Sequence, residues 1–508
     1  MTVAGDYPST PGGWTTLLRR PQQWVLSIDR LPDWVLMAVL VSLGTAVRLA
    51  VFDPATLHAD EALFASRGLH IAETGDIFLI NVSWSLEEPL PFFWALGACV
   101  KLFGNTPLAM RMLDLGAAAV TIGAVYILAR EYGGRLAGWF SALCFAISPF
   151  AILFGASVFT DPPAVALGFA GFAFAARRHP GVAGVLVGAA VSAKLLAVAY
   201  APVGLGLCLL AAPREWRRAL ARYVVGWAIA VGFLVVVMVF RTVALGAPWF
   251  LALQYQRIGG TGILPVSEWP ARAQAWWGTA SYFVVGTSLR IIAIVGIAGS
   301  ALTALRRPRA RALALLLLAI FSVGYVGLLV VTRLPTYDRY VLFVLPALCV
   351  LVGIGLAALC RLIPARLPML SAALALSGFM LLRSSEVVAQ AGAGTFPVGA
   401  QSDTTLSGYV ELCDWLRFPE RQPSVVWNRS LSWTFLYCLD SSAASAYWYP
   451  DSASIEPQAG AQTYLALSRR DDPFTVVSEL RARGINVVEA AIFFWKGQEN
   501  LWLYRLTT

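Results

Sequence analysis

The stretch WVLMAVLVSLGTAVRLAVF, residues 34–52, decides the fold class because it is apolar over almost its whole length. As a helix rising about 1.5 Å per residue, it is long enough to cross the roughly 30 Å hydrocarbon core of a bilayer. The preceding residues 1–33 are polar and carry Arg19, Arg20 and Arg30, and no small-residue cleavage site follows the apolar run. We therefore expect an uncleaved span preceded by a cytoplasmic N-terminal segment, residues 1–33.

The composition of the whole chain agrees with this interpretation. Of the 508 residues, 58% are hydrophobic and only 13% are charged. A soluble globular protein is about half apolar and about a quarter charged, so this chain has too few charges to cover a water-exposed surface. The composition excludes a soluble enzyme, a disordered regulator and a nucleic-acid binder. The net charge of +9 comes mostly from short loops between apolar runs.

The positions of these basic residues predict the topology, because short loops rich in Lys and Arg stay in the cytoplasm. Residues 89–103, PLPFFWALGACVKLF, are short and contain two prolines and Lys101, so we expect a helix on the outer surface rather than a span. We then expect a polytopic helical protein with about eleven spans, at residues 34–52, 112–129, 136–154, 162–176, 181–193, 195–212, 223–243, 282–304, 312–332, 340–360 and 367–383.

With these spans, every short basic loop falls on the inner side. The inner loops carry Arg130 and Arg135; Arg177 and Arg178; Arg214, Arg217, Arg218 and Arg222; Arg306, Arg307, Arg309 and Arg311; and Arg361 and Arg366. The two short segments around Lys194 leave an alternative open, because they could form a broken re-entrant pair instead of two full spans.

Polar residues return after about residue 384, and no later apolar run is long enough to span. Residue patterns predict strands at 423–428, 463–468, 485–490 and 501–506, and helices at 403–416 and 472–484. We expect residues 384–508 to form a small extracytoplasmic α/β domain. Its two cysteines, Cys413 and Cys438, are expected to form a disulfide, because disulfides persist outside the cytoplasm.

A pair of carboxylates follows the first span. The outer loop of about residues 53–111 contains LHADEALFASRGLHIAETGD at residues 57–76, in which Asp60 and Glu61 begin an amphipathic helix that Gly75 can end. Such residues often only cap a helix. At the membrane–water boundary, however, a carboxylate can accept a proton from a hydroxyl and pass it to water. We therefore predict Asp60 and Glu61 as candidate catalytic residues.

Two further acidic sites are predicted to lie at the same outer face of the membrane as Asp60. Asp161, in SVFTDPPA, precedes a span and could be a helix N-cap before proline, but its match in level with Asp60 favours a functional role. Glu87 and Glu88 precede Pro89 at the start of the surface helix.

Cationic side chains face these carboxylates in the predicted topology. They are Arg111, Lys194, Arg257, Arg272, Arg333 and Arg339. Lys194 interrupts an apolar stretch, which indicates either a functional residue or a side chain that extends to the interface. Arg339, in PTYDRYVLFVLP, could anchor the chain at the interface together with its neighbouring tyrosines, or could bind a phosphate through its guanidinium fork. The pattern predicts a cavity open to the outside, suited to an anionic lipid-borne substrate and a hydroxyl acceptor.

These motifs resemble those of the GT-C fold glycosyltransferases that use polyprenyl-phosphate sugars, both in their order along the chain and in the side of the membrane on which they are predicted to lie. Within these enzymes, the resemblance is to the branch of aminoarabinose lipid A transferases and protein O-mannosyltransferases. The resemblance covers about residues 34–360 and rests on Asp60-Glu61, Glu87-Glu88-Pro89, Arg111, Asp161-Pro162, Lys194, Arg339-Tyr340 and Leu345-Pro346. In one departure, many relatives have lysine-proline where this chain has Glu88-Pro89. That lysine is expected to contact the donor phosphate, so this chain must hold the phosphate elsewhere or use another donor.

The resemblance implies a glycosyltransferase domain at residues 34–383 that moves a sugar, with inversion, from a polyprenyl-phosphate donor to a hydroxyl of a glycan, lipid or protein. It places the protein in a bacterial inner membrane with the active site on the extracytoplasmic side. It implies that Asp60 is the general base, that Glu61 orients Asp60 or the acceptor, and that Asp161 holds hydroxyl groups. The residues expected to bind the substrate or the donor phosphate are Glu88, Arg111, Lys194, Arg257, Arg272, Arg339 and Tyr340.

Two alternatives remain open at this stage. No cofactor is required, but Asp60 and Asp161 could hold a divalent cation, as some GT-C relatives do. The rival function is a transporter or flippase of a lipid-linked sugar. Such proteins tend to have paired internal repeats and charges near the middle of the bilayer, whereas this sequence shows no obvious repeat and its acidic residues gather at outer loop ends.

Overall fold

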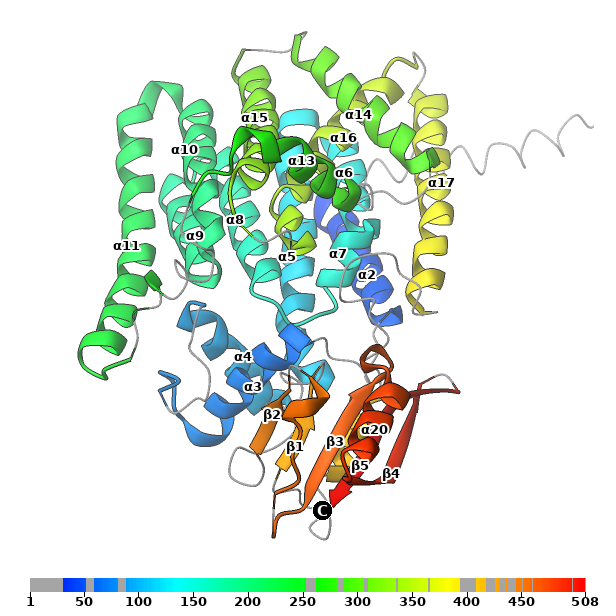
Figure 1. The fold of residues 1–508 in the computed structure, drawn as a ribbon. Coiled ribbons are helices and arrows are strands. Elements are labelled where there is room, and N and C mark those ends of the chain that lie inside the picture. The colour runs from blue at the N-terminus through cyan, green and yellow to red at the C-terminus, as the bar shows by residue number, and fades with distance from the viewer. Residues whose placement is uncertain are drawn as a thin grey trace, which may run out of the picture.

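The structure is a computed structural model. It describes residues 31–51, 59–80, 88–247, 249, 251–252, 262–280, 287–305, 309–334, 337–363, 366–392, 408–416, 425–429, 435, 445–449, 451–458, 460–495 and 497–507. A large layer of helices carries a small C-terminal sheet at one end, and helices α3 and α4 lie at the same end of the layer as that sheet (Figure 1).

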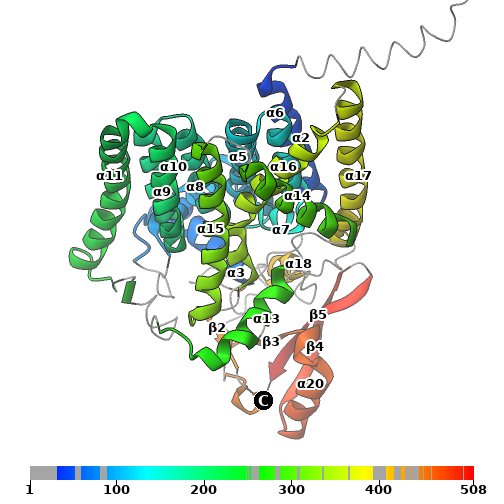
Figure 2. The ribbon, with the colours of Figure 1, turned by 90° about the horizontal axis from the view of Figure 1, so that it is seen from above.

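The helical layer contains α2 (Asp33–Ala50), α5 (Pro107–Gly133), α6 (Arg135–Ile147), α7 (Pro149–Phe154), α8 (Asp161–Ala176), α9 (Pro180–Ala193), η1 (Leu195–Ala199), α10 (Tyr200–Ala211), α11 (Trp216–Val243), α14 (Thr287–Leu305), α15 (Arg309–Val331), α16 (Leu345–Cys360) and α17 (Arg366–Gly392). The connecting elements include α3 (Ala59–Thr74), α4 (Leu90–Phe103), η2 (Pro213–Glu215), α13 (Trp269–Ala280) and η4 (Asp338–Phe343). The view from above shows the same helices in projection (Figure 2).

Helix length and composition support part of the predicted set of spans. Among the described residues, four helices are long and apolar enough to cross a membrane: Asp33–Ala50, Pro107–Gly133, Pro213–Val243 and Ala310–Val331. Most of the other expected spans contain apolar helices of only 10–17 residues, which are shorter than the four long helices. The expected number of eleven spans is therefore not confirmed. The expected span 136–154 is wrong as a continuous helix, because α6 ends before Ser148 and α7 starts at Pro149. Proline lacks the N–H that would continue the helical ladder.

Three of the segments predicted to share the inner face are in contact. Asp33 Oδ2 is 2.6 Å from an Arg130 nitrogen, and Asp33 Oδ1 is 3.4 Å from Arg135 Nε. Arg177 Nε lies 3.4 Å from Glu131 Oε1, which joins the end of α8 to the end of α5. These contacts are at the helix ends opposite to those that carry the candidate site. The structure therefore agrees with the relative sidedness of these loops.

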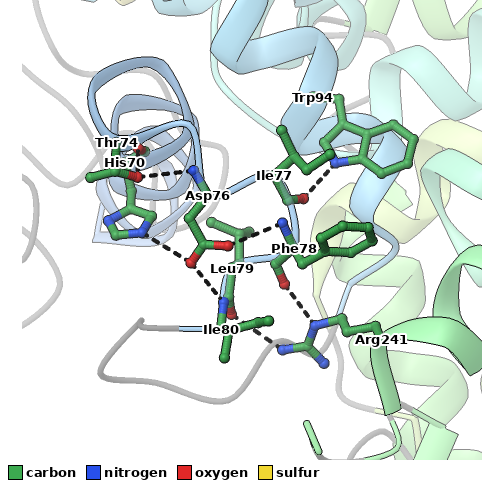
Figure 3. A network of polar contacts seen from close by, with 9 residues as sticks. All are labelled: His70, Thr74, Asp76, Ile77, Phe78, Leu79, Ile80, Trp94 and Arg241. Atoms are coloured by element: carbon green, nitrogen blue, oxygen red, sulfur yellow. Dashed lines mark hydrogen bonds and ion pairs between the residues drawn. The ribbon is translucent and has the colours of Figure 1, made fainter. Parts of the chain in front are cut away.

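The chain after α3 is fixed by polar contacts from three helices (Figure 3). Gly75 ends α3 with a φ of +74°, a conformation that glycine adopts without steric cost. Asp76 then accepts hydrogen bonds from the backbone N–H groups of Phe78 at 3.2 Å and Ile80 at 2.9 Å. His70 Nε2, on α3, lies 3.4 Å from the Asp76 carboxylate.

Two side chains from other helices hold the same loop. Trp94 Nε1, on α4, donates to the Ile77 carbonyl at 2.6 Å. Arg241, near the end of α11, donates to the carbonyls of Phe78 at 2.8 Å and Leu79 at 3.3 Å. Since this loop is bonded to α3, α4 and α11, it helps to fix the helix whose first turn carries Asp60.

The C-terminal part is a mixed sheet. Its strands are β1 (Val425–Asn428), β2 (Ser445–Trp448), β3 (Thr463–Ser468), β4 (Asn486–Trp495) and β5 (Gln498–Thr507), accompanied by α18 (Tyr409–Leu416) and α20 (Pro473–Ala482). The strand order is β2-β1-β3-β5-β4, with β1 parallel to β2 and β3, and β5 antiparallel to β3 and β4. The four predicted strands are confirmed, and β2 was not predicted.

Both faces of the central strands are covered. Side chains alternate between the two faces of a strand. Tyr464 and Ala466 of β3 join the apolar core that includes the membrane helices, whereas Leu465 and Leu467 pack with Leu480 of α20. This explains why every residue of β3 is buried. Cys413 on α18 is disulfide-bonded, and its expected partner Cys438 lies outside the described residues.

Candidate active site

Three residues that are distant in the sequence meet at one end of the helical layer. Asp60 lies in the first turn of α3, Asp161 begins α8, and Arg339 lies in η4. Arg339 Nη1 donates to Asp60 Oδ2 at 2.5 Å, and Arg339 Nε lies 3.8 Å from Asp161 Oδ2. The guanidinium carbon is 5.0 Å from the centre of the Phe159 ring and 4.5 Å from that of Tyr337. Arg339 therefore lies between two carboxylates and is flanked by two aromatic rings.

The solvent exposure of these three side chains decreases from Asp60 through Arg339 to Asp161. Asp60 is 25% exposed, Arg339 is 9% exposed and Asp161 is fully buried. Asp161 Oδ1 has no hydrogen-bond partner among the described residues. Burial alone lowers the pKa of Arg339, but the charges of Asp161 and Asp60 outweigh burial and raise it. The arrangement combines a reachable carboxylate, a fixed cation and a buried carboxylate oxygen that can accept a hydrogen bond.

A second ion pair lies beside Asp60. Arg111 donates from Nε and Nη2 to the two oxygens of Glu61, each at 3.2 Å, and both side chains are at most 5% exposed. Glu61 Oε1 also accepts the backbone N–H of Val158 at 2.8 Å. This fork-like pairing fixes the orientation of the Glu61 carboxylate. Glu61 therefore holds the loop that leads to Asp161.

Asp114 holds the same loop, although it is not among the site residues predicted from the sequence. It is 1% exposed, and its Oδ2 accepts the backbone N–H of Phe159 at 2.8 Å.

The start of α5 places Asp114 near Arg111. Thr106 caps α5 by accepting the N–H of Ala109, so α5 starts at Pro107, earlier than the predicted span. Asp114 then lies one turn after Arg111 on the same face. A carboxylate inside a predicted span was the signal that could have identified it.

A third ion pair joins the surface helix to the segment around Lys194. Lys194 Nζ donates to Glu88 Oε1, and the two side chains are only 7% and 11% exposed. Lys194 Nζ is also 5.9 Å from the centre of the Tyr340 ring. Burial raises the pKa of Glu88, and the neighbouring ammonium opposes this change. Glu88 and Lys194 therefore form a buried ion pair that joins the start of α4 to the residue after α9.

Most of the predicted site residues are thus brought together. The residues in these contacts are Asp60, Glu61, Glu88, Arg111, Asp161, Lys194, Arg339 and Tyr340. Arg272 lies on α13, where its Nη2 is 3.5 Å from the Thr332 carbonyl and its guanidinium is 6.0 Å from the Trp276 ring. Arg257 and Glu87 lie outside the described residues.

The residues do not fit the divalent cation that Asp60 and Asp161 were expected to be able to hold. The guanidinium of Arg339 already lies between their carboxylates. Within the described part of the chain, no group of three or more His, Cys, Asp or Glu residues could hold a metal ion.

Residues 87–241 match the model of the dolichyl-phosphate-mannose-protein mannosyltransferase family. No curated protein sequence matches the chain. Among solved structures, ArnT from Cupriavidus metallidurans bound to undecaprenyl phosphate is similar, with 17% identity, a TM-score of 0.64, and coverage of 92% of this chain and 98% of that chain. The oligosaccharyltransferase of Archaeoglobus fulgidus in complex with zinc and sulfate has 12% identity and a TM-score of 0.53, with coverage of 82% of this chain and 62% of that chain.

These likenesses agree in fold although the sequences have diverged widely. The similarity to ArnT extends over nearly the whole of both chains and includes the C-terminal part. The family match starts at Glu87 and ends at Arg241, so it contains Glu88, Arg111, Asp161 and Lys194. The chain thus shares the GT-C fold of these structures, and over residues 87–241 its sequence resembles the dolichyl-phosphate-mannose-protein mannosyltransferase family.

Proposed function

We propose that the protein is a membrane glycosyltransferase that moves a sugar from a polyprenyl-phosphate donor to a hydroxyl group of a glycan, lipid or protein. The observation that carries this proposal is the position of Arg339 between the exposed carboxylate of Asp60 and the buried carboxylate of Asp161. A cation is available there for a phosphate, and a base is available within a few ångströms for a hydroxyl proton.

The reaction is a direct displacement at the anomeric carbon. Asp60 accepts the proton of the acceptor hydroxyl, and the acceptor oxygen forms the new bond to the sugar. The bond between the anomeric carbon and the phosphate oxygen breaks, and its electron pair leaves with the polyprenyl phosphate. Arg339 stabilises the charge that develops on this phosphate, and Lys194 lies nearby. Attack from the opposite side inverts the anomeric configuration.

The remaining residues position the reacting groups. Asp161 Oδ1, which has no hydrogen-bond partner within the described part of the chain, can accept a hydrogen bond from a sugar or acceptor hydroxyl. Glu61 and Asp114 accept the consecutive backbone N–H groups of Val158 and Phe159. This fixes the loop that leads to Asp161, and also the ring of Phe159 against Arg339. We therefore assign Glu61, Arg111 and Asp114 as positioning residues.

The purified protein, incubated with a polyprenyl-phosphate sugar and candidate acceptors, is expected to give a glycosylated acceptor and free polyprenyl phosphate. Mass spectrometry detects both products. A transporter or flippase would instead move the labelled donor lipid across a proteoliposome membrane without changing its mass. Lipid movement without product formation in every donor–acceptor combination would favour that alternative.

We also propose that the site and the C-terminal sheet lie on the extracytoplasmic side. An Ala453→Cys variant, at an exposed position within η8 (Ser452–Ser454), is expected to react with a membrane-impermeant maleimide in intact cells. Glu215→Cys, at an exposed position before α11, is the matched control and should react only after the cells are opened. The reverse pattern would place the site in the cytoplasm.

A further inference from the structure

Among the described residues, the candidate site contains more acidic than basic side chains. Its five carboxylates are Asp60, Glu61, Glu88, Asp114 and Asp161, and its three cations are Arg111, Lys194 and Arg339. Each cation contacts at least one of these carboxylates. A lipid phosphate adds a further negative charge, so at any of these cations it meets a carboxylate that already occupies part of the same side chain.

The contacts of Arg339 identify the carboxylate that can leave. Asp161 is fully buried at the start of α8, and the loop before it is held by the hydrogen bonds to Val158 and Phe159. Asp60 is 25% exposed, and its neighbour Glu61 is anchored to Arg111. The Asp60 side chain can therefore change rotamer while the first turn of α3 stays in place.

The guanidinium itself is held from several sides. The rings of Phe159 and Tyr337 lie within 5.0 Å of its carbon, and Asp161 lies near its Nε. The edge that carries Nη1 points to Asp60. This edge is therefore the one that faces the more accessible partner, and a phosphate oxygen would be well accommodated there.

We propose that the donor phosphate and Asp60 compete for the Nη1 edge of Arg339, so that binding of the donor releases Asp60 to act as the base. This inference rests on the function proposed above. Before the phosphate binds, the Asp60 carboxylate is engaged in its ion pair with Arg339. After the phosphate has replaced it at Nη1, an exchange of partners at Arg339, the Asp60 carboxylate can accept a hydrogen bond from the acceptor hydroxyl. Binding of the donor thus makes Asp60 available to deprotonate the acceptor hydroxyl, whose oxygen then attacks the donor sugar. The proposal therefore predicts that the donor binds before the acceptor.

The test is the affinity of the full-length protein, in lipid nanodiscs, for undecaprenyl phosphate. Asp60→Asn removes the competing charge, so binding is expected to become about tenfold tighter or more. Asp33→Asn is the matched control, because it breaks an Asp–Arg pair of 2.6 Å at the opposite helix ends and should leave the affinity unchanged. An Asp60→Asn affinity equal to or weaker than that of the wild type would overturn the exchange.

A double-mutant cycle separates competition at Arg339 from general repulsion by Asp60. In an Arg339→Ala background, competition predicts that Asp60→Asn no longer changes the affinity, whereas general repulsion predicts that the gain persists. A persisting gain would overturn the exchange. Thermal unfolding of each variant shows that it is folded before its affinity is compared. If the wild type transfers sugar but the cycle contradicts competition, only the exchange fails. If the wild type neither binds the lipid nor transfers sugar, the proposed function fails with it.

Discussion

Asp60→Asn is expected to lower the kcat of sugar transfer by about 100- to 10,000-fold, which is the usual contribution of a general base. Asparagine has nearly the same size as aspartate but cannot accept the proton of the acceptor hydroxyl. Since the proton moves in the transition state, the loss should fall on kcat rather than on donor binding. Steady-state kinetics with a saturating polyprenyl-phosphate sugar measure this effect.

The same variant tests the simpler interpretation that Asp60 only caps α3. Asparagine caps helices as well as aspartate does, so that interpretation predicts nearly normal turnover. Glu73→Gln is the matched control, because it removes an exposed carboxylate from the same helix, outside the ion pairs of the site. Turnover at the wild-type rate in Asp60→Asn would remove Asp60 from the chemistry.

Much of the fold could be predicted from the sequence, because local signals determined it. Gly75 and Gly484 end α3 and the turn after α20 with positive φ angles, as glycine commonly does at helix ends. The strand β2 was missed because it is a four-residue edge strand that follows a run rich in serine and alanine, which is typical of a loop. The break at Pro149 was overlooked because the apolar run continues through it, although proline is a strong signal for the end of a helix.

The candidate site could be predicted as a set of residues but not as a set of pairs. Carboxylates and cations at outer loop ends were visible in the sequence, whereas their partners depend on tertiary packing. Arg339 and Asp60 are separated by 279 positions in the chain, and Lys194 and Glu88 by 106. For the same reason, the sequence suggested that Glu88 repels the donor phosphate, but it could not indicate that Lys194 balances the charge of Glu88.

Arg111→Met is expected to destabilise the protein by about 3–5 kcal/mol, which is the usual cost of leaving one charge of a buried pair without its partner. Glu61 is 4% exposed and would lose both of its hydrogen bonds from Arg111. The free energy of unfolding in detergent, from denaturant titration, measures the loss. Arg218→Met is the matched control. Its partner Glu215 is 3.9 Å away and both side chains are largely exposed, so little change is expected.

A double variant separates the charge of this pair from its structural role. Glu61→Gln combined with Arg111→Met removes both charges and leaves an amide oxygen that can still accept the N–H of Val158. Because no unpaired charge remains buried, the double variant is expected to recover most of the stability that the single variant loses. If Glu61 acts through the loop before Asp161, transfer activity should recover together with stability. Recovered stability with transfer still abolished would instead mean that the Glu61 carboxylate itself takes part in the reaction, and would overturn its assignment as a positioning residue.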